Sequence, residues 1–238
     1  MELFYVRHGD PIYSPDSLTP LGHRQAEAIS NRLALYGLDE IYTSTSTRAI
    51  MTARPTCEKL KLTHTELDFA HENHVWADFT DVEDNGHRTW VWNIDRYIEL
   101  FTGPEIRALG FEWYRHPDLA AFSFEKGINR VYDAVDEWML SLGYEHERYS
   151  GRYRIVRENG KRVALFAHEG FGLAFFSCLL DIPYPYFSTH FGICHTGMSV
   201  VHFERCGDYS VPKVLTHSND SHLYKEGLPL NYNYFLKF

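Results

Sequence analysis

Cationic side chains follow short apolar runs at three places in the sequence. Arg7 and His8 come directly after the first run, Arg48 stands a few residues beyond the second, and His168 comes directly after the longest one. If these runs are neighbouring parallel strands, their carboxyl ends meet at one edge of a sheet, where ligands bind in open α/β sheets. Such a cluster needs an anion, and a phosphoryl group suits the forked donors of arginine. The sequence therefore predicts a phosphate site at that edge.

His8 has the residue type and the setting of a covalent nucleophile. Neighbouring arginines favour the neutral imidazole, which leaves one ring nitrogen able to attack phosphorus. Gly9 lets the backbone approach a ligand closely. Arg and His donors would stabilise the charge that spreads over the phosphoryl oxygens in the transition state. A leaving alkoxide also needs a proton, and Glu72 is the best-placed carboxylic acid because it follows another candidate strand. The alternatives for this acid are Asp10, Asp78 and Glu83.

Alternating strand and helix patterns supply the sheet that would hold these residues. Thr19-Pro20 is typical of an N-cap and a first helical residue, and a hydroxyl-rich stretch before Arg48 predicts a second helix start. Pro55 should kink or split that second helix. The pattern predicts an α/β fold, a three-layer α/β/α sandwich with a mostly parallel central sheet. The predicted strands are 2–6, 40–43, 63–69, 162–167, 198–203 and, as an edge strand, 210–216, and two further predicted helices cover 128–142 and about 170–180.

The segment from about 73 to 125 breaks this alternation. It holds four of the five tryptophans. We interpret it as an inserted, largely helical cap within a single domain over 1–238, and whether its aromatic residues line a pocket or only pack stays open. Its basic residues are expected to be solvated or paired, although one of them could meet a second anionic group on a substrate. These tryptophans and basic residues are Trp76, Trp90, Trp92, Trp113, Arg88, Arg96, Arg107 and Arg115. Two residues of the first loop, Tyr13 and Asp16, are interpreted as loop structure rather than chemistry.

Composition argues against several classes of protein. The 238 residues carry a formal net charge of −9, which disfavours a general nucleic-acid binder. No run approaches the roughly 20 apolar residues of a membrane helix, and the first residues are typical of a strand rather than a signal peptide. The four cysteines are widely spaced without a CxxC pair, which suits a reducing cytoplasm. We therefore expect a cytoplasmic protein with no nucleic-acid or membrane partner; the oligomeric state stays open, and a homodimer is one arrangement that the sequence allows.

Five motifs run through most of the chain in a fixed order. They are LFYVRHG at 3–9, LTPLGHRQA at 18–26, TSxxxRAxxTA at 43–53, FAHEG at 166–170 and NDSHL at 219–223. Together they resemble the signature elements of the histidine phosphatase superfamily, also called phosphoglycerate mutase-like. Two features depart from the pattern of its mutases: Asp10 and Pro11 follow Gly9, and the stretch after Glu72 is not glycine-rich.

The resemblance implies a histidine phosphatase, a metal-independent phosphomonoesterase that acts on a small phosphorylated metabolite. His8 would become a phosphohistidine, and no cofactor and no metal would be needed. By the same resemblance the catalytic residues are His8, Glu72 and His168, and the substrate phosphate is held by Arg7, Arg48, His168 and Gly9.

Three other functions stay open. A phosphoglycerate-type mutase would return the phosphoryl group to its substrate, and a non-catalytic regulatory module would only bind phosphate. A metal hydrolase could use His64, His71 and His74, and His168-Glu169 begins like a zinc-protease motif, but position 172 is glycine instead of the second histidine. The substrate itself and the balance between phosphatase and mutase cannot be inferred from the residues.

Overall fold

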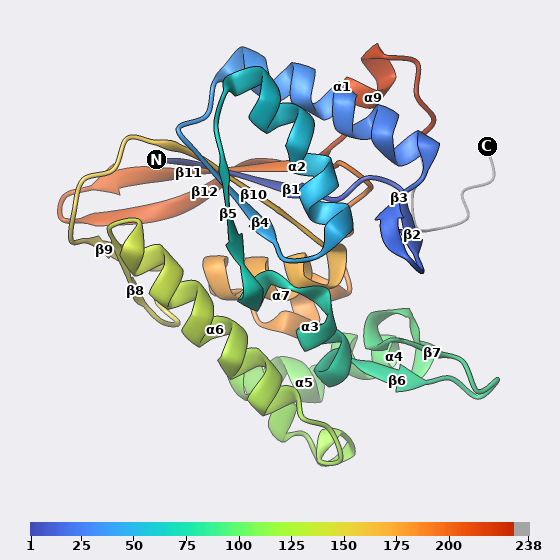
Figure 1. Ribbon diagram of the computed structural model, residues 1–238. Coiled ribbons are helices and arrows are strands. Elements are labelled where there is room, and N and C mark those ends of the chain that lie inside the picture. Colours follow the sequence, from blue (N-terminus) through green and yellow to red (C-terminus); the bar gives the residue numbers. More distant parts are fainter. Residues whose placement is uncertain (231–238) are drawn as a thin grey trace.

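A single large sheet forms the centre of the molecule. The computed structural model describes residues 1–230 of the chain, and within them the sheet has eight strands in the order β5-β4-β10-β1-β11-β12-β9-β8 (Figure 1). These strands are β1 (Glu2–Arg7), β4 (Glu40–Ser44), β5 (His64–Leu67), β8 (Tyr144–Glu147), β9 (Arg152–Ile155), β10 (Arg162–Ala167), β11 (Met198–Cys206) and β12 (Tyr209–Asn219). Two small hairpins stand apart from it: β2 (Pro11–Tyr13) with β3 (Asp16–Leu18), and β6 (Thr80–Val82) with β7 (Arg88–Trp90).

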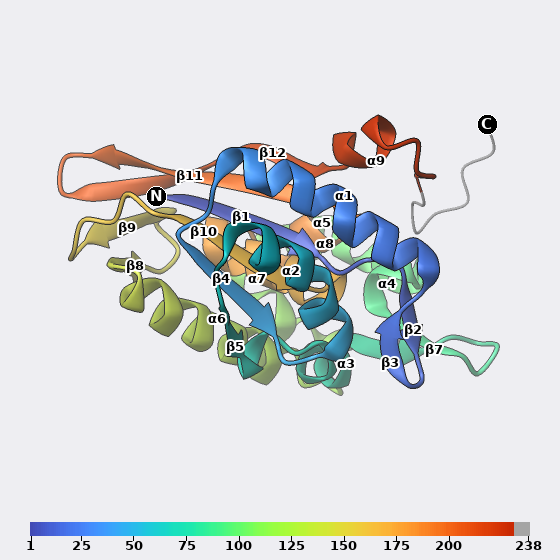
Figure 2. The same ribbon diagram turned by 45° about the horizontal axis from the view of Figure 1, so that its top comes forward.

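Helices cover both faces of the sheet. They are α1 (Pro20–Tyr36), α2 (Thr47–Leu60), α3 (Glu72–Phe79), α4 (Asp95–Thr102), α5 (Pro104–Leu109), α6 (Phe124–Ser141), α7 (Glu169–Leu180), α8 (Tyr184–Ser188) and α9 (Ser221–Lys225). Short 3₁₀ turns occupy Asp68–Ala70, Val91–Asn93, Gly110–Arg115 and Pro117–Leu119. Figure 2 shows α1 and α2 on one side of the sheet and α6 and α7 on the other. The predicted α/β sandwich is confirmed.

The alternating side chains of the central strands create the two cores. In β1, Leu3 and Tyr5 point into the larger core beneath α6 and α7, whereas Phe4 and Val6 point into the smaller core beneath α1 and α2. Successive side chains on a strand point to opposite faces, so a strand buried on both faces must be apolar throughout. This explains the continuous apolar runs in β1 and β10.

The parallel half of the sheet carries the strand ends that matter for chemistry. β5, β4, β10 and β1 run parallel to one another, so the residues that follow them meet at one edge. The remaining four strands are antiparallel and extend the sheet beyond β1.

The predicted helix starts have the expected cap chemistry. The Thr19 side chain accepts a hydrogen bond from the Gly22 amide at the start of α1, and the Ser46 side chain does the same for the Ala49 amide in α2. The prediction that Pro55 splits α2 is wrong, because the helix continues from Thr47 to Leu60. Its buried face against α1 and the second core outweighs the one hydrogen bond that a proline removes.

The other half of the sheet was predicted less completely. β12 is not an edge strand, because the β8–β9 hairpin pairs with its far side. The hairpin strands have four residues each and carry charged side chains at most positions, so they lack an apolar run. The 7–18 loop likewise contains the β2–β3 hairpin.

Residues 68–123 form the segment between β5 and α6. Its aromatic side chains fall into two groups: Trp92 and Trp113 are buried in the larger core, whereas Trp76 and Trp90 are partly exposed. The segment therefore contributes both to packing and to a surface. Within the described residues, no helix is both long and apolar enough to span a bilayer.

Candidate active site

His8 lies at the carboxyl end of β1 and is 1% exposed. Its amide donates to the Ala167 carbonyl at 2.9 Å, and the next amide, that of Gly9, donates to Thr52 Oγ1 at 2.9 Å. Gly9 also packs directly on Gly22 of α1, where a Cβ on Gly9 would come within 2.7 Å of the Gly22 carbonyl oxygen. The histidine is thus fixed by the neighbouring strand and by two helices.

The His8 ring has a defined tautomer. Its Nδ1 lies 2.7 Å from the Gly9 carbonyl oxygen, and because a carbonyl only accepts, Nδ1 carries the proton. Burial lowers the pKa of His8 well below its ordinary value, and the nearby positive charges lower it further. The neutral ring therefore keeps a lone pair on Nε2.

His168 lies beside His8, with 5.2 Å between the two ring centroids. Its Nε2 donates to Ser44 Oγ at 2.8 Å, while Nδ1 accepts from Arg48 Nη2 at 3.1 Å. Burial, followed by the Arg48 charge, lowers the pKa of His168 well below its usual range. The second histidine is therefore a neutral, oriented ring at the end of β10.

Arg48 lies in the first turn of α2 and contacts three groups of the site. Its guanidinium donates to Asp16 Oδ1 at 2.9 Å and to Glu72 Oε2 at 3.4 Å, besides the contact with His168. The Tyr13 ring stacks against it, with 5.4 Å from Cζ to the ring centroid. The structure thus places Tyr13 and Asp16 in direct contact with the predicted phosphate-binding arginine.

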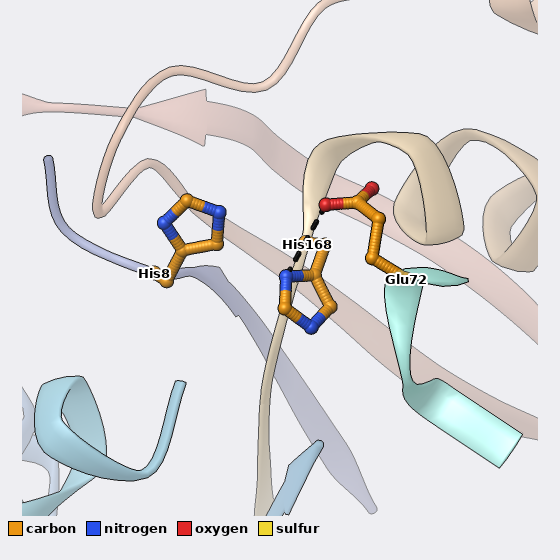
Figure 3. Close-up of side chains that lie close together, drawn as sticks. All are labelled: His8, Glu72 and His168. Atoms are coloured by element: carbon orange, nitrogen blue, oxygen red, sulfur yellow. Dashed lines mark ion pairs between the residues drawn. The ribbon is translucent and has the colours of Figure 1, made fainter. Parts of the chain in front are cut away.

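Glu72 opens α3, and its two oxygens face different partners. Oε1 accepts from the amides of Gly170 at 2.8 Å and Phe171 at 3.3 Å, in the first turn of α7. Oε2 lies 3.3 Å from His168 Nδ1, the contact dashed in Figure 3. Burial raises the pKa of Glu72 above its ordinary value, against the opposing effect of Arg48. A proton on Oε2 would face the two histidines.

Arg7 is buried, and its guanidinium contacts the first residue of α7 and the loop that follows α8. Its Nη1 donates to Glu169 Oε2 at 2.9 Å and to the Ile193 carbonyl at 2.6 Å. Its buried Nε has no hydrogen-bond partner among the described residues. In the sequence, Glu169 belongs to the FAHEG motif at 166–170, and with His168 it begins like a zinc-protease motif that the chain does not complete.

His195 is a member of the site that the sequence analysis did not single out. Its ring centroid lies 5.7 Å from that of His8, and its Nδ1 lies 3.5 Å from Asp10 Oδ1. Burial lowers the pKa of His195 to about 3. It lies in a loop and does not follow an apolar run, so its position in the sequence did not predict a place in the site. Asp10, an alternative acid in the sequence, faces this histidine and Thr19.

The other sequence candidates lie elsewhere. Asp78 pairs with Arg130 at 2.7 Å, His74 lies 3.2 Å from Asp68, and His64 lies 3.9 Å from Glu66. His71 caps α3 and lies near His168, with 6.2 Å between ring centroids. The three histidines considered for a metal therefore do not gather in one place.

A different group could hold a metal ion. One ligand atom each of His8, Glu72 and His168 lies within 4.8 Å of the others (Figure 3). Arg48 Nη2, however, already lies within 3.4 Å of both His168 Nδ1 and Glu72 Oε2. A guanidinium at this position repels a second cation, so the donor set suits an anion better than a metal.

A cavity of about 650 Å³ opens beside this centre. It is lined by Asp16 and Arg48, by Glu72 and further residues of α3, and by residues of β7 and the loop before β7. Its volume falls within the range of about 300–1,000 Å³ that is usual for small-molecule sites.

Comparisons with known proteins agree with this geometry. Residues 3–96 match the family model described as the histidine phosphatase superfamily (branch 1). A search of curated proteins finds no significant match.

Solved structures share the fold at low sequence identity. A phosphoserine phosphatase variant from Entamoeba histolytica, solved with phosphoserine, is 16% identical, with a TM-score of 0.60 over 93% of this chain and 98% of that one. YhfR of Bacillus stearothermophilus is 19% identical, with a TM-score of 0.59 over 93% and 98%. A mycobacterial glucosyl-3-phosphoglycerate phosphatase, solved with VO3, is 20% identical, with a TM-score of 0.57 over 90% and 97%. The N-terminal strands and helices are therefore similar to the histidine phosphatase superfamily, and the chain shares the fold of these solved structures over at least 90% of its length.

Proposed function

We propose that this protein is a metal-independent phosphomonoesterase that acts on a small phosphorylated metabolite through a phosphohistidine at His8. The observation that carries the proposal is the neutral, buried His8 ring, whose Nδ1 donates to the Gly9 carbonyl and whose Nε2 faces Glu72 and His168 (Figure 3). The solved relatives whose names describe phosphatases of small phosphate esters support the same reaction class.

In the first step, His8 Nε2 attacks phosphorus and the bond from phosphorus to the ester oxygen breaks. Arg48 and His168 neutralise the charge on the phosphoryl oxygens, and Glu72 Oε2 gives its proton to the leaving oxygen. Because Oε1 is held by two backbone amides, the carboxyl group keeps Oε2 directed at the site during the transfer. The products are the free alcohol and phosphohistidine.

In the second step, water attacks the phosphohistidine. Glu72, now ionised, accepts a proton from the water, the phosphorus–nitrogen bond breaks, and inorganic phosphate leaves. Arg7 is likewise proposed to bind the phosphoryl oxygens, since its buried Nε has no hydrogen-bond partner among the described residues. Its pair with Glu169 and its contact with the Ile193 carbonyl hold the side chain in place.

The direct test is a comparison of the wild type with His8→Ala. We expect the wild type to hydrolyse p-nitrophenyl phosphate and to yield an acid-labile, alkali-stable labelled protein when a ³²P-labelled substrate is quenched during turnover. The variant should carry no label, and its kcat should be lower by a factor of at least about 10³. Equal turnover by both proteins, or label in the variant, would refute the nucleophile.

Two further measurements separate the alternatives. Activity should survive EDTA, since Arg48 occupies the position of a metal; loss of activity restored by a divalent ion would favour a metal hydrolase. Transfer of the label to a second phosphoglycerate instead of to water would favour a mutase, and phosphate binding without label would favour a regulatory module.

We also propose a cytoplasmic location, on the ground that all four cysteines are free thiols. A homodimer remains a prediction that a mass measurement in solution can test. Neither proposal affects the chemistry at His8.

A further inference from the structure

The cavity beside the catalytic centre has walls of two kinds. On the side of the phosphate site, its two carboxylates, Asp16 and Glu72, both contact Arg48. Away from Arg48, the lining combines the indoles of Trp76 and Trp90 with Arg88, which donates to Thr80 Oγ1 at 3.1 Å, and with the polar side chains of His71, Asn73, His87 and Thr89. A leaving group attached to the bound phosphate would therefore share this cavity with the two indoles, which form its aromatic wall.

Trp90 of that wall is fixed next to the proposed acid. Its ring stacks on buried Trp92, with 4.5 Å between centroids and 15° between planes. A Cβ on Gly170 would lie 2.3 Å from Trp90 Cη2 and 2.7 Å from Glu72 Oε1, so the indole and the carboxyl group pack against the same glycine. The ring thus lies beside the carboxyl group of the proposed acid.

Trp76 completes the wall. It meets Trp90 edge to face, with 4.8 Å between centroids and 87° between planes, and it remains 36% exposed. Exposed indoles that touch each other at the mouth of a cavity keep apolar surface in contact with water, and a flat ligand would remove that surface from water. Tyr13, on the opposite side and 69% exposed, offers a second ring at the same opening.

We propose that the preferred substrates are phosphate monoesters whose leaving group carries a flat aromatic ring, held against Trp76 and Trp90. The inference rests on the proposed phosphatase function and deepens it. Aromatic side chains gain stabilisation from offset or edge-to-face ring contacts beyond the burial of area, so a flat ring should bind better than a saturated ring of the same size.

The test compares three substrates that all release a primary alcohol: benzyl, cyclohexylmethyl and ethyl phosphate. The shared leaving-group class limits differences in intrinsic reactivity, so kcat/KM should report the pocket. We expect the order benzyl, cyclohexylmethyl, ethyl, with benzyl about tenfold above ethyl, as ring burial and stacking imply. Equal values for all three, or cyclohexylmethyl equal to benzyl, would overturn the aromatic preference.

Variants connect the preference to the wall. Trp76→Ala should lower the benzyl-to-ethyl ratio about fivefold, and Trp76→Phe should restore most of it. Tyr224→Ala, at an 82% exposed ring far along the chain on α9, is the control and should leave the ratio unchanged. An unchanged ratio in Trp76→Ala would place the preference elsewhere.

Failure of the inference can be told apart from failure of the function. If wild type hydrolyses all three esters equally and His8→Ala hydrolyses none, the phosphatase stands and the aromatic pocket does not. If His8→Ala retains full activity, the proposed function fails first.

Discussion

At the scale of single residues, side chains reach the site by two routes, from the ends of strands and from loops. His8, Arg48 and His168 each follow a strand of the parallel half, and the structure brings them together with Glu72. A position shortly after an apolar run predicts the first three residues but not His195, since His195 reaches His8 through a loop folded back over the end of β1. Side chains that arrive by loops depend on tertiary contacts that local patterns do not encode.

Glu72→Gln tests the assignment of the acid. The amide keeps the size and can still accept from the α7 amides, but it cannot deliver a proton to the leaving oxygen. We expect kcat for an alkyl phosphate to fall about 10²–10⁴-fold, and to fall much less for p-nitrophenyl phosphate, whose leaving group needs little protonation.

The pH profile gives an independent check on the same residue. Activity of the wild type should fall as the pH rises through the elevated pKa of Glu72, because the first step needs the protonated acid. In Glu72→Gln this alkaline limb should disappear. A limb that persists in the variant would assign the titration to another group.

At the scale of elements, the close contact between the loop after β1 and α1 explains why positions 9 and 22 are both glycine. A Cβ on Gly22 would lie 2.2 Å from the Asp10 carbonyl oxygen, so the loop that carries His8 rests directly on the helix. The sequence marked Gly22 only as part of a motif, since close backbone approach is not visible in a linear pattern.

Gly22→Ala should therefore lower the stability of the protein, although a change from glycine to alanine inside a helix usually raises it. In an open helix, alanine is more favourable than glycine by about 1 kcal/mol. Here the clash should lower the free energy of unfolding by about 1–3 kcal/mol and displace His8, with loss of activity. Gly160→Ala, where no atom lies within 4 Å of the added Cβ, is the control. Chemical denaturation of both variants measures the difference, and a stabilised Gly22→Ala would show that the loop can move away.

The β8–β9 hairpin, which sequence patterns missed, is held by a buried ion cluster as well as by Tyr144 and Tyr153, which pack in the larger core. His146 lies between Asp136 at 2.7 Å and Asp181 at 3.1 Å, and its ring stacks on Tyr153. Although burial opposes it, hydrogen bonds to the two carboxylates raise the pKa of His146 to about 9.

The sign of the resulting pH dependence is fixed by the raised pKa. Protonated His146 contributes to the free energy of unfolding. This contribution is fully present below a pH of about 6.5, the pKa of histidine in the unfolded chain, and is lost as the pH rises through about 9, the pKa of His146 in the folded protein. It amounts to roughly 3 kcal/mol, at 1.36 kcal/mol for each unit. Urea denaturation at pH 6 and pH 10 should show this decline in the wild type and a smaller one in His146→Gln. Equal declines would exclude His146 as the source.

At the scale of the whole molecule, the alternation of apolar strand runs with helix patterns predicted the layered fold, because both cores need continuous apolar strands. It did not predict the width of the sheet, since the outer strands are charged and amphipathic. The two cores also decide which thiols are accessible. Burial raises the pKa of Cys57, Cys178 and Cys194, whereas Cys206 is exposed.

Thiol labelling should therefore report global unfolding. We expect a thiol reagent to modify one cysteine quickly in the native protein and the other three only in denaturant. A Cys206→Ser variant should lose the fast phase alone. Rapid native labelling of a second thiol would show that one of the cores opens locally, because buried groups react through opening events.

The division of the site between two parts of the chain has a consequence for how such proteins diversify. The proposed nucleophile and the groups proposed to hold the phosphoryl oxygens come from the sheet edge, whereas Glu72 and the Trp76–Trp90 wall come from one stretch, residues 71–90. The proposed proton donor and the proposed leaving-group pocket thus lie on one continuous piece of the chain. Exchange of that stretch between related chains would change which alcohol is released and how it is protonated, while the attack on phosphorus stays as it was.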